Sequence, residues 1–249
     1  MSEPLISVVI PAYNCARVIG RAIDSALKQK VALEILVLDD GSSDDLEAVM
    51  AGYQGNEAVR FAKNEENLGA AATRNRGVTL ARGKYVAFLD ADDYWTEDKL
   101  SRQHALMEQT GCVLSCTARE LMTPEGELTG KVIPVKEIIT YRELLKHNSI
   151  NCSSVLIRTD VAREFPMHHD DCHEDYIMWL EVLRKYETAC GINEPMLKYQ
   201  LSNSGKSGNK LHSAKMTFMV YRRMGFSMTK SVACFCSYAF HGVKKYFFH

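Results

Sequence analysis

The sequence lacks any apolar run long enough to cross a membrane. A transmembrane helix needs about 20 consecutive, mostly apolar residues, whereas the longest candidate here, residues 232–240, is far shorter. The N-terminus also lacks the cationic stretch and apolar core of a secretory signal peptide. Together these absences favour a protein that works in the cytoplasm.

Prolines are few, and repeats and low-complexity segments are missing. Six prolines among 249 residues, without any compositionally biased stretch, argue against long linkers and disordered regions. A chain of this length supports one sizeable core with a small appendage. We expect a main catalytic domain over residues 1–210 and a helical tail over residues 211–249.

The cysteines lack the spacing of a metal site. None of the eight forms a CxxC pair or a zinc-finger pattern. In a cytoplasmic protein we expect these thiols to be reduced and mostly buried.

Acidic residues are absent from the C-terminal part of the chain. The last is Glu194, and nine lysines and arginines follow it. The first 194 residues carry 21 cations and 31 anions, so a net charge of −1 conceals an acidic body and a basic tail. Apolar and aromatic residues among these cations suit a helix lying on an anionic membrane, which predicts peripheral contact through residues 213–249. A tail packed on the main domain and a dimer interface are alternatives, and nothing indicates a nucleic-acid partner.

What is present is an alternation of buried strands and amphipathic helices. Apolar β-branched runs predict strands over residues 6–10, 34–38, 59–62 and 85–89. Helical spacing predicts helices over residues 17–28, 70–81 and 96–109. This alternation is typical of an α/β fold with a mostly parallel sheet. Further along, we expect strands over residues 113–117 and 153–158, helices over 140–146 and 175–185, and two tail helices broken near Gly225.

Polar residues follow three of the four N-terminal strands. Tyr13 and Asn14 follow the first, Asp39 and Asp40 end the second, and residues 90–93 follow the fourth. Ligands of parallel sheets bind at the carboxyl ends of the strands. These groups should therefore converge on one crevice.

The strongest single feature is Asp90-Ala91-Asp92-Asp93. Three carboxylates this close repel one another unless a cation lies between them. Mg²⁺ or Mn²⁺ suits such a site, because Mg²⁺ often binds through one or two carboxylates and substrate phosphates. A cluster that caps the helix beginning near Thr96 is the structural alternative.

Three further features each allow two interpretations. Asp40 suits a hydrogen bond to a nucleotide base or ribose, or a turn before Gly41. Arg74 suits phosphate oxygens, or an ordinary surface position. Glu174 and Asp175 are favoured at a helix N-terminus, and one of them could instead be the general base for an incoming hydroxyl.

Six stretches, in this order, resemble bacterial family-2 glycosyltransferases of the GT-A fold, especially small enzymes of cell-surface polysaccharide synthesis. They are SVVIPAYN (7–14), LDDGSSD (38–44), ENLG (66–69), TRNRG (73–77), FLDADD (88–93) and ED (174–175). The resemblance covers roughly residues 5–200. It implies inverting transfer of a sugar from a nucleotide-diphosphate donor, usually a UDP-sugar, to a glycan or lipid-linked acceptor, with Mn²⁺ or Mg²⁺.

The resemblance also implies a role for each matching residue. Asp90 and Asp92 form the DxD motif that holds the metal, and Asp175, with Glu174 beside it, deprotonates the acceptor. Tyr13 packs against the base, Asp40 hydrogen-bonds it, and Arg74 supports the diphosphate. The full set of implied donor-binding residues is Pro11, Ala12, Tyr13, Asp40, Asn67, Gly69, Arg74, Asp90 and Ala91.

The chain departs from the family after residue 198. Gln200 and Ser202 stand where the family usually has Arg and His, so Lys206 could supply the phosphate contact in the loop Ser204 to Lys210, which retains Ser207 and Asn209. The QxxRW motif of processive synthases is absent. We therefore expect one sugar to be added per encounter.

Two other functions are weaker interpretations. A sugar-1-phosphate nucleotidyltransferase should carry a glycine-rich GxGxR loop where this chain has Pro11-Ala12-Tyr13-Asn14. A non-catalytic carbohydrate-binding protein would not need both Asp92 and Asp175.

Overall fold

A computed structural model describes residues 4–168, 171–201 and 210–247, with the side chains of the last segment described for residues 212–240. Its strands are β1 (Ile6–Ala12), β2 (Leu33–Asp39), β3 (Val59–Lys63), β4 (Tyr85–Phe88), β5 (Tyr94–Trp95), β6 (Leu114–Met122), β7 (Leu128–Ile133), β8 (Ile138–Thr140), β9 (Leu156–Arg158) and β10 (Thr188–Gln200). Its helices are α1 (Ile19–Leu27), α2 (Leu46–Ala51), α3 (Ala70–Leu80), α4 (Lys99–Thr110), α5 (Tyr141–Lys146), α6 (Thr159–Glu164), α7 (Glu174–Tyr186), α8 (Lys210–Arg223) and α9 (Met228–Phe247), with a short 3₁₀ turn, η1 (Cys152–Ser154).

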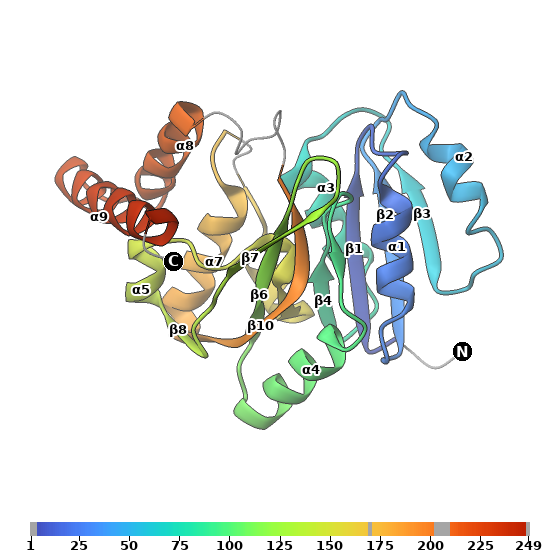
Figure 1. Ribbon diagram of the computed structural model, residues 1–249, viewed down its shortest axis with the longest axis horizontal. Helices are drawn as coiled ribbons and strands as arrows, with labels where there is room; N and C mark the ends of the chain where they lie inside the picture. The colour runs from blue at the N-terminus through green and yellow to red at the C-terminus, as the bar shows by residue number, and fades with distance from the viewer. Residues whose placement is uncertain (1–3, 169–170, 202–209, 248–249) are drawn as a thin grey trace.

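The strands form one sheet in the order β3-β2-β1-β4-β9-β6-β10-β5, with β7 beside β6 and β8 beside β10 (Figure 1). The β3-β2-β1-β4 half is entirely parallel, as the alternation of strands and helices predicts. In the other half, β9 is antiparallel to β4 and β6, and β10 returns parallel to β6. The chain segments that follow β1, β2 and β4 therefore all leave the sheet at the same edge.

The central strands are mostly apolar because both faces of the sheet are covered. On one face, Val9 and Leu36 pack with α3, α6 and α7, and buried residues of α8 join the same cluster. On the other face, Val8 and Ile35 pack with α1, α2 and α4. Neighbouring residues of one strand thus serve opposite cores, as the two-residue period of a strand requires.

The predicted helices and the four N-terminal strands are present with small shifts at their ends. The prediction of a strand over residues 153–158 is wrong in its first half. Residues 152–154 form η1, because the backbone N–H and the hydroxyl of Ser154 both donate to the carbonyl of Asn151. The strand itself begins only at Leu156.

Two cysteines contradict the expectation of reduced thiols. Cys112 and Cys190 form a disulfide, with their Cα atoms 6.3 Å apart. The parallel register of β6 and β10 sets Cys190 opposite Ser115, three positions after Cys112, and so brings the two cysteines into the same region at the start of β6. Of the free cysteines, Cys116, Cys152 and Cys172 are buried, whereas Cys236 is exposed.

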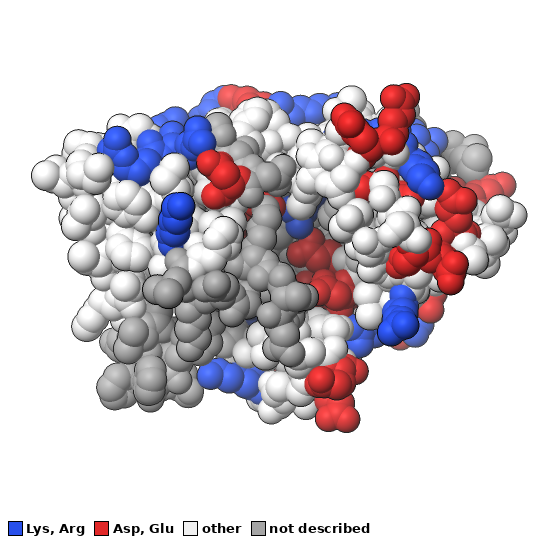
Figure 2. All heavy atoms as spheres, turned by 90° about the horizontal axis from the view of Figure 1, so that it is seen from above, with Lys and Arg blue, Asp and Glu red and all other residues white. Residues whose placement is uncertain are grey.

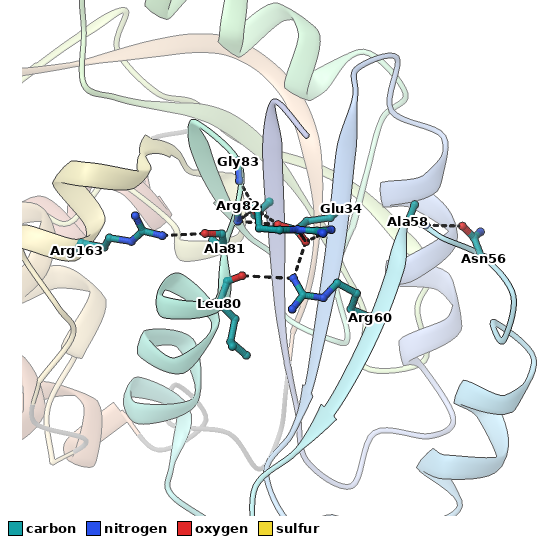
Figure 3. Close-up of polar contacts among 10 residues, drawn as sticks. Glu34, Asn56, Ala58, Arg60, Leu80, Ala81, Arg82, Gly83 and Arg163 are labelled. Atoms are coloured by element: carbon teal, nitrogen blue, oxygen red, sulfur yellow. Dashed lines mark hydrogen bonds and ion pairs between the residues drawn. The ribbon is translucent and has the colours of Figure 1, made fainter. Parts of the chain in front are cut away.

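A buried acid that is remote from the predicted crevice joins the amino ends of the strands. Glu34, at the start of β2, accepts hydrogen bonds from the Ser7 hydroxyl (2.7 Å), the Arg60 guanidinium (2.7 Å) and the Arg82 backbone (2.8 Å) (Figure 3). Burial alone would raise the pKa of Glu34, but these hydrogen bonds outweigh it and lower the pKa. The carboxylate therefore contributes to stability when ionised.

We expect Glu34→Gln to reduce the free energy of unfolding by about 2 to 3 kcal/mol, because hydrogen bonds to a charged group contribute that much and an amide satisfies them poorly. Urea denaturation at neutral pH measures the difference. The contribution should shrink as pH falls through the lowered pKa of Glu34, since protonation removes the charge. Glu57→Gln, at an exposed position, is the control, and an equal loss in both variants would contradict a special role for Glu34.

No helix in the described segments combines the length and apolarity that a bilayer crossing demands.

Candidate active site

The carboxyl ends of β1, β2 and β4 meet at one edge of the sheet because these strands are parallel neighbours. Viewed from above, acidic side chains gather in a hollow between the half of the molecule that carries β1 to β3 and the half that carries α8 and α9 (Figure 2). The predicted crevice therefore corresponds to an acidic depression in the surface.

Arg74 links acids from two distant parts of the chain. It projects from α3, is only 7% exposed, and donates from Nη2 to Asp90 Oδ1 (2.6 Å) and from Nη1 to Glu174 Oε1 (3.0 Å). Asp90 follows β4, whereas Glu174 begins α7, one hundred positions beyond Arg74. A buried guanidinium that holds two carboxylates fixes their relative position, because both charges would otherwise lie unpaired in a poorly solvated place.

Asp92 is an acid held in an unfavourable electrostatic environment. Burial, and then the negative charge of Asp90, raise the pKa of Asp92 to about 6. Its backbone carbonyl accepts a hydrogen bond from Arg21 Nη2 (2.7 Å), which fixes the loop from α1. A divalent cation at this place would remove the repulsion between Asp90 and Asp92.

The residues present fit a metal that binds together with a substrate. In the part of the chain that the structure describes, no group of three or more His, Cys, Asp or Glu side chains is placed to hold a metal alone. Two carboxylates completed by donor phosphates are, however, a typical ligand set for Mg²⁺. Asp90 and Asp92 would supply those two carboxylates.

Asp93, the third acid of this segment, has a structural role. It is fully buried, and its Oδ1 accepts a hydrogen bond from the backbone of Gln200 at the end of β10 (2.8 Å). Burial, followed by the charges of Asp92 and Asp90, raises the pKa of Asp93 well above its ordinary range. Asp93 therefore ties the acidic loop to β10 and does not face the hollow as a ligand would.

Asp40 organises the loop that precedes α3. Its Oδ1 accepts hydrogen bonds from Asn64 Nδ2 (2.7 Å) and Leu68 N (2.8 Å), and its Oδ2 accepts one from Gly69 N (2.9 Å). Gly69 caps α3 with a positive φ of 85°, a conformation that glycine adopts without strain. Asp40 thus positions the start of α3, the helix that carries Arg74. Both carboxylate oxygens of Asp40 already accept hydrogen bonds.

The other predicted donor-binding residues line the same edge. Pro11 and Ala12 are the last residues of β1, and Tyr13 after them is 55% exposed. Asn67 is exposed in the loop before α3, and Ala91 is half-buried between the two DxD acids. An exposed aromatic ring directly after a buried strand provides a flat surface on which a nucleotide base can stack.

Asp175 lies in the first turn of α7 and next to Glu174. Its Oδ1 accepts a hydrogen bond from the backbone of Tyr176 (2.8 Å). Burial, and then the charge of Glu174, raise its pKa to about 6, although His173 and Arg74 act in the opposite direction. A carboxylate with this pKa is ionised at neutral pH and still basic enough to accept a proton.

Three residues that sequence reasoning did not single out as site components support this arrangement. Ser153 Oγ accepts a hydrogen bond from Asp90 N (3.0 Å), and its carbonyl accepts one from Trp95 Nε1 (2.7 Å). Arg21 bridges Asp92 and Gln200, since it also donates to Gln200 Oε1 (2.6 Å). Gln200 was noted only as a departure from the family, and no local pattern marks Arg21 or Ser153. The loop residues Ser204, Lys206, Ser207 and Asn209, and Ser202 before them, lie outside the described residues.

Comparison with known proteins places this geometry in context. Residues 7–164 match the family described as Glycosyl transferase family 2. The chain is 37% identical over 246 residues to TuaG of Bacillus subtilis (strain 168), a glycosyltransferase assigned to teichuronic acid biosynthesis, and the match covers 98% of each chain. It is 31% identical over 245 residues to WfaP of Escherichia coli, named as a UDP-Glc:alpha-D-GlcNAc-diphosphoundecaprenol beta-1,3-glucosyltransferase, covering 98% of this chain and 96% of that one.

The fold is similar to that of TarS from S. aureus, whose residues 1–349 were solved with UDP-GlcNAc. The TM-score is 0.72 at 16% sequence identity, and the match covers 92% of this chain and 70% of that one. The similarity confirms the predicted α/β architecture of GT-A type.

Proposed function

The chain belongs to glycosyl transferase family 2, and we propose that it transfers one sugar, with inversion, from a UDP-sugar to a hydroxyl of a glycan or lipid-linked acceptor. The observation that carries the proposal is the Arg74 bridge. One guanidinium contacts Asp90, which would face the donor diphosphate, and Glu174, which is next to the proposed base Asp175. Donor and acceptor groups therefore share a single centre.

The donor would occupy the edge between β1 and α3. In this proposal Tyr13 stacks on the uracil, and Pro11, Ala12, Asn67, Gly69 and Ala91 shape the pocket around the nucleoside. Asp40 contributes mainly by holding the backbone of residues 68–69, with a remaining lone pair for the base. Asp90 and Asp92 would hold Mn²⁺ or Mg²⁺, and such an ion, when bound, stabilises negative charge on the departing diphosphate.

Asp175 would act as the general base. It accepts the proton of the acceptor hydroxyl while that oxygen forms a bond to the anomeric carbon, and the bond between that carbon and the UDP oxygen breaks. The attack comes from the face opposite the leaving group, so the configuration inverts. Glu174 is engaged by Arg74 and would keep Asp175 in position and raise its basicity through its charge.

The acceptor class follows from the relatives. The name of WfaP specifies a sugar carried on diphosphoundecaprenol, and TuaG is assigned to a cell-surface polymer. We therefore propose an acceptor sugar on a lipid diphosphate or a growing glycan, met at the inner face of the cytoplasmic membrane.

The test is UDP release from a panel of UDP-sugars with Mn²⁺, with and without GlcNAc diphosphate on a short alkyl chain. We expect acceptor-dependent release that EDTA abolishes, and a β-linked product from an α-linked donor, identified by the NMR coupling of the anomeric proton. An α-linked product would overturn inversion. Release of GDP from GDP-sugars, without release of UDP from any UDP-sugar, would overturn the donor assignment.

A further inference from the structure

The outward face of α9 carries no charge over most of its described length. Helix α9 packs on α5 and α8 through its inner face, where Ser231 is fully buried and the Tyr238 ring stacks on His147 at 5.7 Å between centroids. The residues that face outward over positions 232–240 are all apolar or sulfur-containing. They are Val232, Ala233, Cys236, Ala239 and Phe240.

This face is exposed to an unusual degree for apolar side chains. Met228 is 58% exposed, Val232 46% and Phe240 70%. Residues 228, 232, 236 and 240 are spaced four apart, so they form one stripe along the helix. A surface helix of a water-soluble domain normally turns polar residues to solvent, and a contiguous apolar stripe indicates an interaction surface.

Exposed cations lie on the same pair of helices as the stripe. Lys215, Arg222 and Lys230 are exposed on α8 and α9, and no salt bridge joins any of them to an acid within the described segments. Arg222 instead donates to the Phe226 carbonyl (2.6 Å), and Lys230 lies 3.8 Å from the Phe226 ring centroid. Because no acidic residue follows Glu194, all the charged residues of the α8 and α9 hairpin are lysines and arginines.

This combination favours an anionic lipid surface over a second copy of the chain. A symmetric dimer would bring the same patch against itself, so cations would face cations across the interface. Apolar residues flanked by lysine and arginine match instead the layered chemistry of a bilayer, whose acyl region lies beneath anionic headgroups.

The hairpin also lies beside the acceptor side of the active site. Helix α8 packs on α7, and the Ser213 hydroxyl lies 3.4 Å from Nε2 of His173, two residues before Asp175. Figure 1 shows α8 and α9 at one end of the molecule, on the side of α7 away from β1 to β3. A membrane in contact with the hairpin would therefore lie close to the proposed base.

We propose that α8 and α9 form a docking surface for an anionic phospholipid membrane, with the stripe of α9 inserted among the acyl chains and the cations contacting the headgroups. Docking itself does not depend on sugar transfer. Its consequence, presentation of Asp175 to acceptors held in that membrane, rests on the proposed function.

The test is co-sedimentation of the full chain with vesicles of phosphatidylcholine alone or mixed with phosphatidylglycerol. We expect binding only to the anionic vesicles.

Arg222→Gln and Lys230→Gln should each weaken the binding to anionic vesicles about fivefold, since one cation near such a surface contributes about 1 kcal/mol. The double variant Val232→Asp, Phe240→Asp should weaken it by more than about tenfold, because charged groups would have to enter the acyl region. Phe61→Asp, at an exposed position on the edge strand β3, is the matched control and should bind normally.

Two measurements keep the outcomes distinct. Thermal unfolding checks that each variant is folded, and UDP affinity checks that its donor site is intact, so failure of docking is separate from failure of the proposed function. Equal binding to both vesicle types, no binding to either, or an equal loss in the Phe61 variant would each overturn the proposal. A dimer of the wild type that the double variant disrupts, seen by analytical ultracentrifugation, would replace the lipid surface with a second copy.

Discussion

Asp175→Asn is expected to reduce kcat for sugar transfer by about 10³-fold, within the range typical for loss of a general base. The amide has nearly the same size and can still accept a hydrogen bond from the backbone of Tyr176, so α7 should keep its first turn. It cannot accept a proton from the acceptor hydroxyl. Initial rates of UDP release at saturating donor and acceptor measure the loss.

The binding of donor should survive this substitution. Contacts to the donor are proposed for the other side of the Arg74 bridge, so UDP affinity measured by calorimetry in the presence of Mn²⁺ should change less than about threefold. Asp160→Asn, an exposed acid on α6, is the control for the chemical change itself. Turnover at the wild-type rate in the Asp175 variant would remove this residue from the mechanism.

The pH profile provides a second measure of the same base. Because the pKa of Asp175 is raised to about 6, the carboxylate is protonated and inactive below that pH and ionised above it. The rate for the wild-type enzyme should therefore rise with pH through about 6 and level off near neutrality. At donor and Mn²⁺ concentrations that saturate the site at every pH, so that titration of Asp92 does not affect the rate, the residual kcat of the Asp175 variant should lack that inflection.

The N-terminal half of the fold could be predicted from the sequence because its information is local. The strands β1, β2 and β4 are short and mostly apolar, and the polar residues that matter follow directly at their ends. Parallel neighbours place those ends together without any knowledge of distant contacts. Asp40, Asp90 and Asp92 could thus be assigned to one edge from their position in the strand order alone.

The rest depends on contacts between distant segments. β10 spans 13 residues but contains Gly191, Pro195 and two charged residues, so it shows neither the alternation nor the apolar run of a strand. Its pairing with β6 creates the Cys112–Cys190 bond and brings Gln200 to Asp93, and both contacts are invisible in spacing. The hydroxyl of Ser153 reaches Asp90 across 63 positions for the same reason.

Asp40 has a structural role that neither sequence interpretation included. Sequence reasoning offered a base contact or a turn before Gly41, whereas the structure shows its oxygens accepting hydrogen bonds from the loop that caps α3. The turn before Gly41 is formed by Asp39, whose Oδ1 accepts a hydrogen bond from Ser42 N. That loop sets the position of Arg74, which in turn holds Asp90 and Glu174. The hydrogen bonds of Asp40 therefore help to position the proposed catalytic groups through the start of α3.

Asp92→Ala is expected to weaken UDP affinity in the presence of Mn²⁺ by about 100-fold. Loss of a group that merely orients a ligand typically lowers metal affinity 10- to 100-fold, so loss of a ligand itself should reach the upper end of that range. The UDP affinity measured in EDTA should be the same for variant and wild type, because the nucleoside contacts are proposed for Tyr13 and the end of β1. Calorimetric titration of UDP with and without Mn²⁺ gives both values for each protein.

The position of Asp92 also determines how this affinity should depend on pH. With a pKa raised to about 6 by burial and by Asp90, the carboxyl is increasingly protonated below that pH, and a protonated acid is a poor ligand. The Mn²⁺-dependent part of the UDP affinity should therefore fall as the pH drops below about 6 in the wild type, and should not change with pH in the Asp92 variant.

Asp98→Ala, which removes an exposed carboxylate six positions further on, is the control and should behave as the wild type. If UDP affinity with Mn²⁺ is the same in the wild type and in the Asp92 variant, Asp92 is not a metal ligand, and the repulsion between Asp90 and Asp92 must be relieved by the positive charges of Arg21 and Arg74.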